Sequence, residues 1–246
     1  MVIREIRAKN ILSKSQIYDY TINPYVGCTH ACAYCYARFM KRFTGHLEPW
    51  GRFVDVKVNA VDLLRRVIAK AKPGRVWISG VCDPYQPLER KYRLTRGCLE
   101  VLAEHGWTVT IQTKSPLVLR DIDLLRGKPG VEVGMSIATA EENMRKLFEP
   151  GAPPVGERIK ALGVLHDAGV RTFAMIAPVL PGAEGLPSLL AGKVDRVTID
   201  RLNYHYADWV YKKYHLEASM TDEFFAAKSE ELKRAFDSLG IGCRVI

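Results

Sequence analysis

The sequence predicts an α/β fold, a partial (β/α)6 barrel of the TIM type with parallel strands, in a single domain of residues 1–246. From residue 61 onward, apolar segments of strand length alternate with amphipathic segments of helix length, as in chains that wind a parallel sheet. Glycines follow several of the helical segments, as in KPG, EHG and DAG, where a left-handed residue commonly ends a helix. With 246 residues, 48% of them hydrophobic, the chain can bury one large core.

Six segments are predicted strands because they are short, apolar and rich in β-branched and aromatic residues. They are Tyr18–Ile22, Arg75–Val81, Trp107–Thr113, Val131–Ile137, Val170–Pro178 and Val194–Ile199. A right-handed series of six such strands curls into a partial barrel, and its functional loops lie at the carboxyl ends of the strands.

Helices are predicted between these strands and after the last one. The crossover helices are Ala60–Ala71, Leu94–His105, Pro116–Leu125, Glu157–Ala168 and Leu186–Ala191. The C-terminal segment, about residues 203–240, is predicted to be helical. Its main helix, Thr221–Leu239, begins with the capping residue Thr221 and two acids, which favour a helix N-terminus.

Composition narrows the class of protein. The N-terminus has no apolar signal region, and no window approaches the roughly 18 apolar residues of a membrane span, so we expect a cytoplasmic protein that does not enter a membrane.

The formal net charge of +9 favours an anionic partner such as nucleic acid. However, no run of like charges stands out, and a solvated basic surface explains the same count.

Three cysteines lie close together in Asn23–Arg38, directly after the first predicted strand. Their pattern, Cys28-x3-Cys32-x2-Cys35, lets one short loop bind a metal centre. Three thiolates can hold three irons of a [4Fe–4S] cluster and leave the fourth iron open, whereas an electron-transfer cluster normally takes four cysteines. Zinc bound by the three cysteines and His30 or His46 is the alternative. We expect Cys98 and Cys243 to be small buried residues, and we assign them no function in binding or catalysis.

The CxxxCxYC pattern resembles the signature of the radical S-adenosylmethionine (SAM) superfamily. The resemblance implies that SAM chelates the open iron and that an external electron donor of the flavodoxin or ferredoxin type reduces the cluster. Reduction then cleaves SAM and releases a 5′-deoxyadenosyl radical that abstracts hydrogen from a substrate. By the same resemblance, Tyr34 lies against the adenine of SAM.

Further segments resemble the spore photoproduct lyase-like group, often labelled DNA repair photolyase. They are Ser79–Arg96, Thr113–Leu125, Glu149–Val170 and Ala177–Gly182. This resemblance implies that Ser79 and Gly80 receive the amino group of SAM with Asp83 beside them. It also implies that Lys114 approaches the carboxylate of SAM and that Ser136 faces the ribose.

One departure from the lyases concerns the hydrogen donor. The lyases carry a donor cysteine that aligns with Gly80, while Cys82 falls where they carry a serine. Cys82 is therefore a candidate substitute donor and Tyr36 a candidate radical relay, although a buried thiol and a packed aromatic fit the same positions. The group resemblance makes nucleic acid the first substrate to test.

The competing function is a zinc-stabilised, non-catalytic nucleic-acid-binding domain. The segment Leu202–Leu216, rich in aromatics and lysines, could contact an anionic partner, but we expect its aromatics to pack on the barrel.

Overall fold

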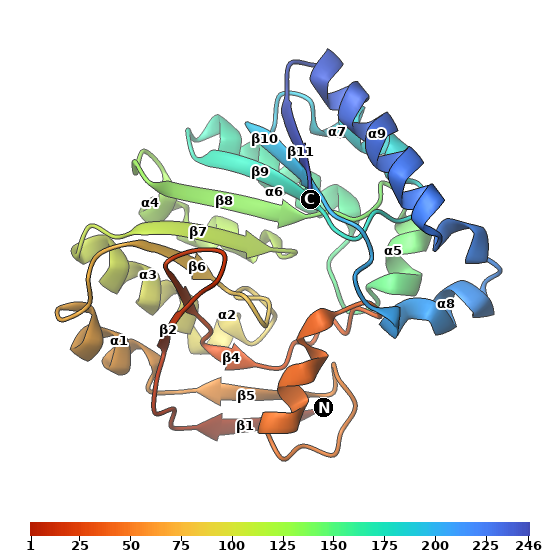
Figure 1. Cartoon of the computed structure of the whole chain (residues 1–246). Helices are drawn as coiled ribbons and strands as arrows, with labels where there is room; N and C mark the ends of the chain where they lie inside the picture. Colours follow the sequence, from red (N-terminus) through yellow and green to blue (C-terminus); the bar gives the residue numbers. More distant parts are fainter.

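The computed structural model describes residues 1–246 and contains one large parallel sheet with helices on one side (Figure 1). The sheet has eight strands in the order β11-β10-β9-β8-β7-β6-β3-β2. All neighbouring pairs are parallel except β2 with β3. The edge strands β2 and β11 do not pair with each other, so the barrel is partial, as the sequence predicts.

Each predicted strand is present, with slightly different ends. The sheet consists of β2 (Leu12–Lys14), β3 (Tyr20–Ile22), β6 (Arg75–Ile78), β7 (Thr108–Thr113), β8 (Val131–Ser136), β9 (Arg171–Ile176), β10 (Arg196–Ile199) and β11 (Gly242–Val245). The two edge strands β2 and β11 extend the predicted set of six.

The helices also follow the predicted order. They are α1 (Ala60–Ile68), α2 (Glu89–Tyr92), α3 (Leu94–Glu104), α4 (Ile122–Leu125), α5 (Glu142–Phe148), α6 (Val155–Asp167), α7 (Leu186–Leu190), α8 (Asp208–Lys213) and α9 (Asp222–Ser238). The predicted helix Pro116–Leu125 is a 3-10 turn, η2 (Pro116–Asp121), followed by α4. At the start of α9 the Thr221 hydroxyl accepts a hydrogen bond from the Phe224 backbone N–H at 3.1 Å, which confirms the predicted cap.

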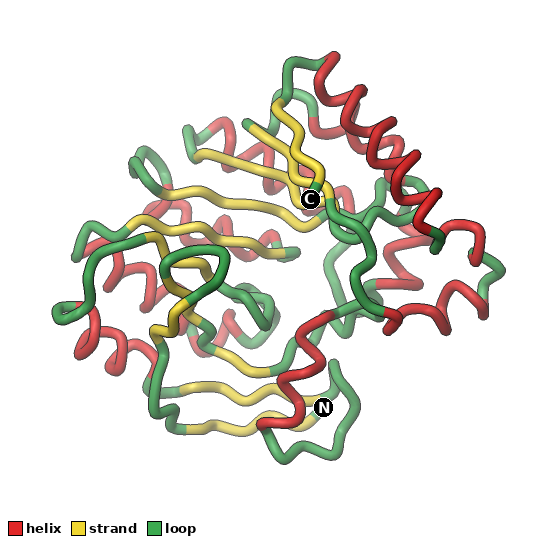
Figure 2. The backbone as a smooth tube through the Cα atoms, viewed as in Figure 1, coloured by secondary structure: helices red, strands yellow, loops and turns green.

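The sequence analysis missed a second sheet near the N-terminus. Its three strands are β1 (Val2–Ile6), β5 (Phe53–Lys57) and β4 (Tyr25–Val26), in the order β1-β5-β4. Figure 2 shows these strands beside the large sheet, joined to it by loops. Because β4 ends two residues before Cys28, this small sheet supports the first part of the cysteine loop.

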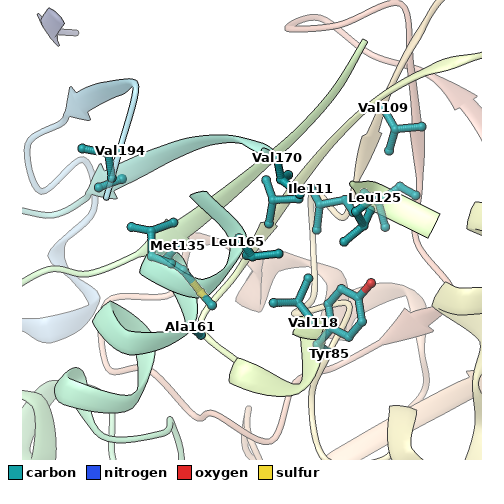
Figure 3. Packing of buried hydrophobic residues seen from close by; sticks show 14 of the residues in the cluster. Tyr85, Val109, Ile111, Val118, Leu125, Met135, Ala161, Leu165, Val170 and Val194 are labelled. Carbon is teal, nitrogen blue, oxygen red and sulfur yellow. The ribbon is translucent and has the colours of Figure 1, made fainter. Parts of the chain in front are cut away.

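The main core lies between the large sheet and its helices. One face of each strand points to the helices, as Val109 and Ile111 of β7 do, together with Met135 of β8 and Leu165 of α6 (Figure 3). The other face points into the barrel and carries larger and more polar residues, such as Trp77, Gln112 and Phe173. None of the helices combines the length and apolar character that crossing a bilayer requires.

Candidate active site

The three predicted metal-binding cysteines lie in one loop held on several sides. The Gln86 side chain accepts from the Thr29 N–H at 3.2 Å and donates to the Gly27 carbonyl at 3.2 Å. The Ala33 N–H donates to the Phe148 carbonyl at 2.7 Å. These bonds connect the loop to segments on both sides of it and fix its course before any cofactor binds.

Two glycines allow neighbouring backbone to approach this loop. Gly27 has a φ of +91°, and a Cβ there would lie 2.4 Å from the Phe53 carbonyl oxygen of β5. A Cβ at Gly151 would lie 2.2 Å from the Thr29 carbonyl oxygen. A larger residue at either place would push the loop away from its supports.

The structure brings most of the predicted site residues to one cavity, here called the cysteine cavity. Its lining includes all three cysteines of the loop and residues from the carboxyl ends of β6, β7 and β8. Of the predicted residues it includes Cys28, Cys32, Cys35, Tyr36, Ser79, Gly80, Cys82, Asp83, Lys114 and Ser136. Convergence at the carboxyl ends of the strands is the arrangement expected of a barrel active site.

The three thiols are free and mostly buried, with exposed fractions of 7% for Cys28 and 7% for Cys32. Burial raises the pKa of Cys32 to about 12, although the Lys114 ammonium opposes this shift. The free thiol is therefore neutral, and metal binding would convert it to a thiolate. Three sulfur donors that line one cavity, two of them buried and that of Cys35 partly exposed, fit an iron–sulfur cluster.

The histidines named in the zinc alternative have other partners. His46 Nε2 lies 2.8 Å from an Asp55 carboxylate oxygen, and its Nδ1 lies 3.0 Å from Glu48. His30 Nδ1 lies 3.3 Å from Asp83. No group of three or more His, Cys, Asp and Glu side chains is arranged to hold a single metal ion.

Asp83 joins the cysteine loop to the end of β7. Its carboxylate accepts from the Thr113 hydroxyl at 2.6 Å and from the Lys114 backbone N–H at 2.7 Å, besides contacting His30. Burial disfavours the Asp83 carboxylate, yet His30 and these hydrogen bonds lower its pKa to about 2. The structure thus gives Asp83 a positioning role that the sequence analysis did not foresee.

Lys114 belongs to a buried network of charges centred on Glu149. Its Nζ lies 3.7 Å from a Glu149 carboxylate oxygen, and Arg158 Nη1 lies 2.6 Å from the other. Burial disfavours the Lys114 charge, but Glu149, and Cys32 when it is ionised, raise the pKa of Lys114 overall. Arg158 is fully buried. The sequence analysis did not identify Glu149 as part of this charge network, because its partners are distant from it in the sequence.

Tyr34 is the one predicted cofactor-binding residue outside the lining of the cysteine cavity. Its hydroxyl donates to Glu149, and Lys114 Nζ lies 5.6 Å from the centre of its ring. Its contact with adenine stays a prediction.

Polar contacts fix the remaining residues. The Ser79 hydroxyl donates to Asn23 Oδ1 at 2.6 Å and lies 3.0 Å from the Cys82 sulfur. Ser136 accepts from Gln112 Nε2 at 3.0 Å, and the Tyr36 hydroxyl donates to the Gly80 carbonyl. The sequence analysis missed Gln112, because it belongs to no motif. The only signal for a role in the site was its position one residue before Thr113, where the side chain of the strand faces the barrel interior.

Aromatic side chains of two segments are exposed beside this region. In the 3-10 helix η1 (Tyr36–Phe43) they are Tyr36, Phe39 and Phe43, and in the C-terminal segment they are Tyr204, Tyr206, Trp209 and Tyr214. Of the aromatic residues in Leu202–Leu216, only Tyr211 is buried, with its ring centre 4.8 Å from that of Phe148. The expectation that these aromatics pack on the barrel is therefore wrong for most of them.

Two solved structures show a fold similar to that of this chain. The spore photoproduct lyase with bound AdoMet and dinucleoside spore photoproduct has a similar fold, with a TM-score of 0.69 and 17% identity over 99% of this chain and 81% of that chain. Streptococcus suis SuiB bound to its precursor peptide SuiA gives a TM-score of 0.59 with 13% identity, over 92% of this chain and 48% of SuiB.

Sequence relatives extend the comparison. An uncharacterized protein of Methanocaldococcus jannaschii is 39% identical over 181 residues, which cover 73% of this chain and 68% of the relative. One from Mycobacterium tuberculosis is 31% identical over 194 residues, covering 74% of this chain and 57% of the relative. A radical SAM Nα-GlyT isomerase of Pseudomonas phage M6 is 27% identical over 65% of this chain and 33% of its own length.

The Radical SAM superfamily model matches residues 22–184, which include the cysteine loop and the strands that form the cysteine cavity. This family implies a [4Fe–4S] cluster and SAM as cofactors. The chain belongs to the radical SAM superfamily of enzymes.

Proposed function

We propose that Cys28, Cys32 and Cys35 hold a [4Fe–4S] cluster at which the protein cleaves SAM reductively, with an electron from a flavodoxin or ferredoxin type of donor. The observation that supports this most is the shared cavity: the three thiols and the predicted SAM contacts line the same space. When bound, the cluster and SAM supply a carbon radical able to abstract hydrogen.

The residues around the cavity have separable tasks in this proposal. The Lys114 ammonium binds the SAM carboxylate, a contact for which a compact cation is suited. The Ser136 hydroxyl, oriented by Gln112, faces the ribose, and Ser79 and Gly80 receive the amino group. Asp83 holds the cysteine loop against β7, and Tyr34 lies toward the adenine.

We propose nucleic acid as the substrate class. The net charge of +9 favours a polyanion, and the exposed aromatics, of which Tyr36 lines the cysteine cavity, can stack on unpaired bases. Arg42 lies 4.7 Å from the ring centre of Phe43, and Arg38 lies 5.2 Å from that of Tyr206. Cations interleaved with aromatic rings are typical of single-strand binding surfaces.

Cys82 is the proposed hydrogen donor, and Tyr36 the proposed relay. Burial raises the pKa of Cys82 to about 11, so the thiol keeps the hydrogen that a donor must give. Tyr36 is 42% exposed and contacts the backbone of Gly80, between the exposed aromatics and the cavity.

The cofactor proposal is tested by preparing the protein without oxygen. We expect a brown protein with iron and sulfide near four each per chain, as a [4Fe–4S] cluster requires, and 5′-deoxyadenosine after addition of SAM and a reductant. A colourless protein with one zinc per chain would instead support the non-catalytic binding domain.

Whether the protein carries out the reaction of the spore photoproduct lyases is tested with a dinucleotide spore photoproduct. Because Gly80 stands at the donor position of the lyases, we expect 5′-deoxyadenosine to form without repair of the photoproduct. Repair that is lost in Cys82→Ala would make Cys82 a relocated donor. Repair that persists in Cys82→Ala would show that neither Gly80 nor Cys82 limits the reaction.

A further inference from the structure

Trp50 lies in the short turn before β5, and this turn packs against the cysteine loop. The next residue, Gly51, has a φ of +90°, and a Cβ there would overlap the Cβ of Ala31, which lies in the middle of that loop. Two residues further on, the Phe53 carbonyl oxygen occupies the space that a Cβ at Gly27 would need. These two close contacts hold the backbone around Trp50 beside the cysteines.

Aromatic packing orients the ring of Trp50. Its ring centre lies 5.8 Å from that of Phe53, with the two planes at 85°, which is the edge-to-face arrangement that aromatic pairs favour. Phe53 is fully buried and stacks on His46, with 4.1 Å between the ring centres. His46 is held in turn by Asp55, 2.8 Å from its Nε2. The direction of the indole N–H is therefore set by buried neighbours.

The indole N–H of Trp50 is a buried donor without a nitrogen or oxygen acceptor, although nearly all buried polar groups have a partner. Its neighbour is the sulfur of Cys35. Burial raises the pKa of the Cys35 thiol, and the donors that oppose this shift include the backbone N–H of Ala37 and the indole N–H of Trp50. A neutral thiol is a weak acceptor, whereas a thiolate carries the charge that makes a hydrogen bond strong.

From these observations we propose that the indole N–H of Trp50 donates a hydrogen bond to the Cys35 thiolate and thereby raises the reduction potential of the cluster. This inference rests on the proposed function, which assigns Cys35 to a [4Fe–4S] cluster. Trp50 does not line the cysteine cavity. Because it acts through Cys35, it is a positioning residue rather than a catalytic one.

The physical reason is the charge that reduction adds. The added electron makes the cluster and its thiolates more negative, so a donor to one sulfur stabilises the reduced state more than the oxidised state. The Trp50 hydrogen bond therefore makes the cluster easier for the external donor to reduce.

Loss of the hydrogen bond and loss of packing shift the potential in opposite directions. Removing the donor lowers the potential. A gap that admits water raises it, because water stabilises the added negative charge. Trp50→Phe removes the N–H and keeps an apolar ring against Phe53, so the sign of its shift distinguishes the two effects.

The test is a potentiometric titration of the reconstituted protein, in which electron paramagnetic resonance (EPR) measures the reduced cluster. In Trp50→Phe we expect the equilibrium constant for reduction to fall roughly tenfold, as for one lost hydrogen bond to a charged group. This equals a shift of about 59 mV to more negative potential for one electron. Iron and sulfide contents should equal those of the wild type. Trp107→Phe makes the same change in a buried tryptophan just before β7, at the opposite end of the strands, and should leave the potential unchanged.

A second measurement needs no change at Trp50. Tryptophan labelled with ¹⁵N in the indole ring is incorporated into the wild type, and pulsed EPR of the reduced cluster is recorded. We expect a ¹⁵N coupling that persists in Trp77→Phe, the other tryptophan with a buried indole N–H that lacks an acceptor. Absence of this coupling in the wild type would overturn the inference.

Two results of the titration would also overturn it: an unchanged potential in Trp50→Phe, and a shift to more positive potential. 5′-Deoxyadenosine is measured separately after addition of SAM. If Trp50→Phe shows the expected shift but the wild type does not cleave SAM, the inference stands and the proposed function fails. If SAM is cleaved and the potentials are equal, the inference alone fails.

Discussion

Basic residues lie at both ends of the partial barrel, and the two groups differ in their partners. At the carboxyl ends of the strands, Lys114 and Arg158 share the buried Glu149. Toward the amino ends, Arg75 and Arg171 are the first residues of β6 and β9 and have no carboxylate partner. A cation as buried as Arg158 requires a partner because desolvation is costly, whereas a partly solvated arginine does not. Ion pairs tie the first group to the fold, whereas no ion pair constrains the second.

The largest effect is expected at the carboxyl end, from the cysteines. Replacing any one of Cys28, Cys32 and Cys35 with alanine should abolish cluster binding and formation of 5′-deoxyadenosine, because a cluster held by three thiolates loses its site with any of them. Absorbance and iron content measure cluster binding, and chromatography measures the formation of 5′-deoxyadenosine. Cys98→Ala, which alters a buried cysteine of α3, is the control. A Cys32→Ala protein that still cleaves SAM would refute the assignment.

The next largest effect is expected on stability, from the buried ion pairs of Glu149 with Arg158 and Lys114. Glu149→Gln leaves Arg158 buried without an ionic partner and should lower the free energy of unfolding by about 3 kcal/mol, measured by urea denaturation. Glu230→Gln breaks an exposed pair with Arg234 and should cost under about 0.5 kcal/mol. If Glu149→Gln and Glu230→Gln both lowered the free energy of unfolding by the same small amount, the buried cations would not depend on their partner and the two groups of cations would not differ.

The same pair predicts a pH dependence. The fold lowers the pKa of Glu149 below its ordinary value of 4.5: burial opposes this shift, and Arg158 and Lys114 outweigh it. The stabilisation is therefore present above pH 4.5 and is lost as the pH falls below that value. Glu149→Gln should show a smaller loss of stability than the wild type between pH 5 and pH 3.

Lys114 both contacts Glu149 and is proposed to bind SAM, and replacing it tests these two roles separately. Lys114→Ala should weaken SAM binding by roughly tenfold, as expected for one lost charge-assisted contact, while the cluster absorbance is retained. Lys128→Ala, in the exposed loop before β8, should bind SAM like the wild type. Unchanged SAM affinity in Lys114→Ala would limit this lysine to its contact with Glu149.

The smallest effect is expected from the arginines without an ion pair, Arg171 of β9 and Arg244 of β11. Arg171→Gln and Arg244→Gln should each change the free energy of unfolding by less than about 0.5 kcal/mol, because no ion pair is broken and both residues are exposed. Urea denaturation of the ligand-free protein measures this. A loss above about 1 kcal/mol in either variant would assign these arginines to the fold and contradict the comparison.

The sequence by itself determined the six parallel strands, the crossover helices and the cysteine loop. These depend on local patterns: short β-branched segments form strands, and Cys28-x3-Cys32-x2-Cys35 places three thiols in one loop whatever surrounds it. Lys114, Ser79 and Ser136 were named by the resemblance to the spore photoproduct lyase-like group. They lie near the carboxyl ends of predicted strands, which a parallel barrel brings together.

Only the tertiary structure decided which side chains meet across large separations in sequence. Glu149 contacts Lys114 and Tyr34 because α5 ends beside the cysteine loop, and no spacing in the chain encodes that distance. The small sheet was missed because β4 has two residues and β1 is a largely exposed edge strand, too short and too polar to show a pattern. Four arginines on four different strands line one cavity, because the curvature of the sheet turns their inward positions toward a common space. They are Arg75, Arg171, Arg196 and Arg244.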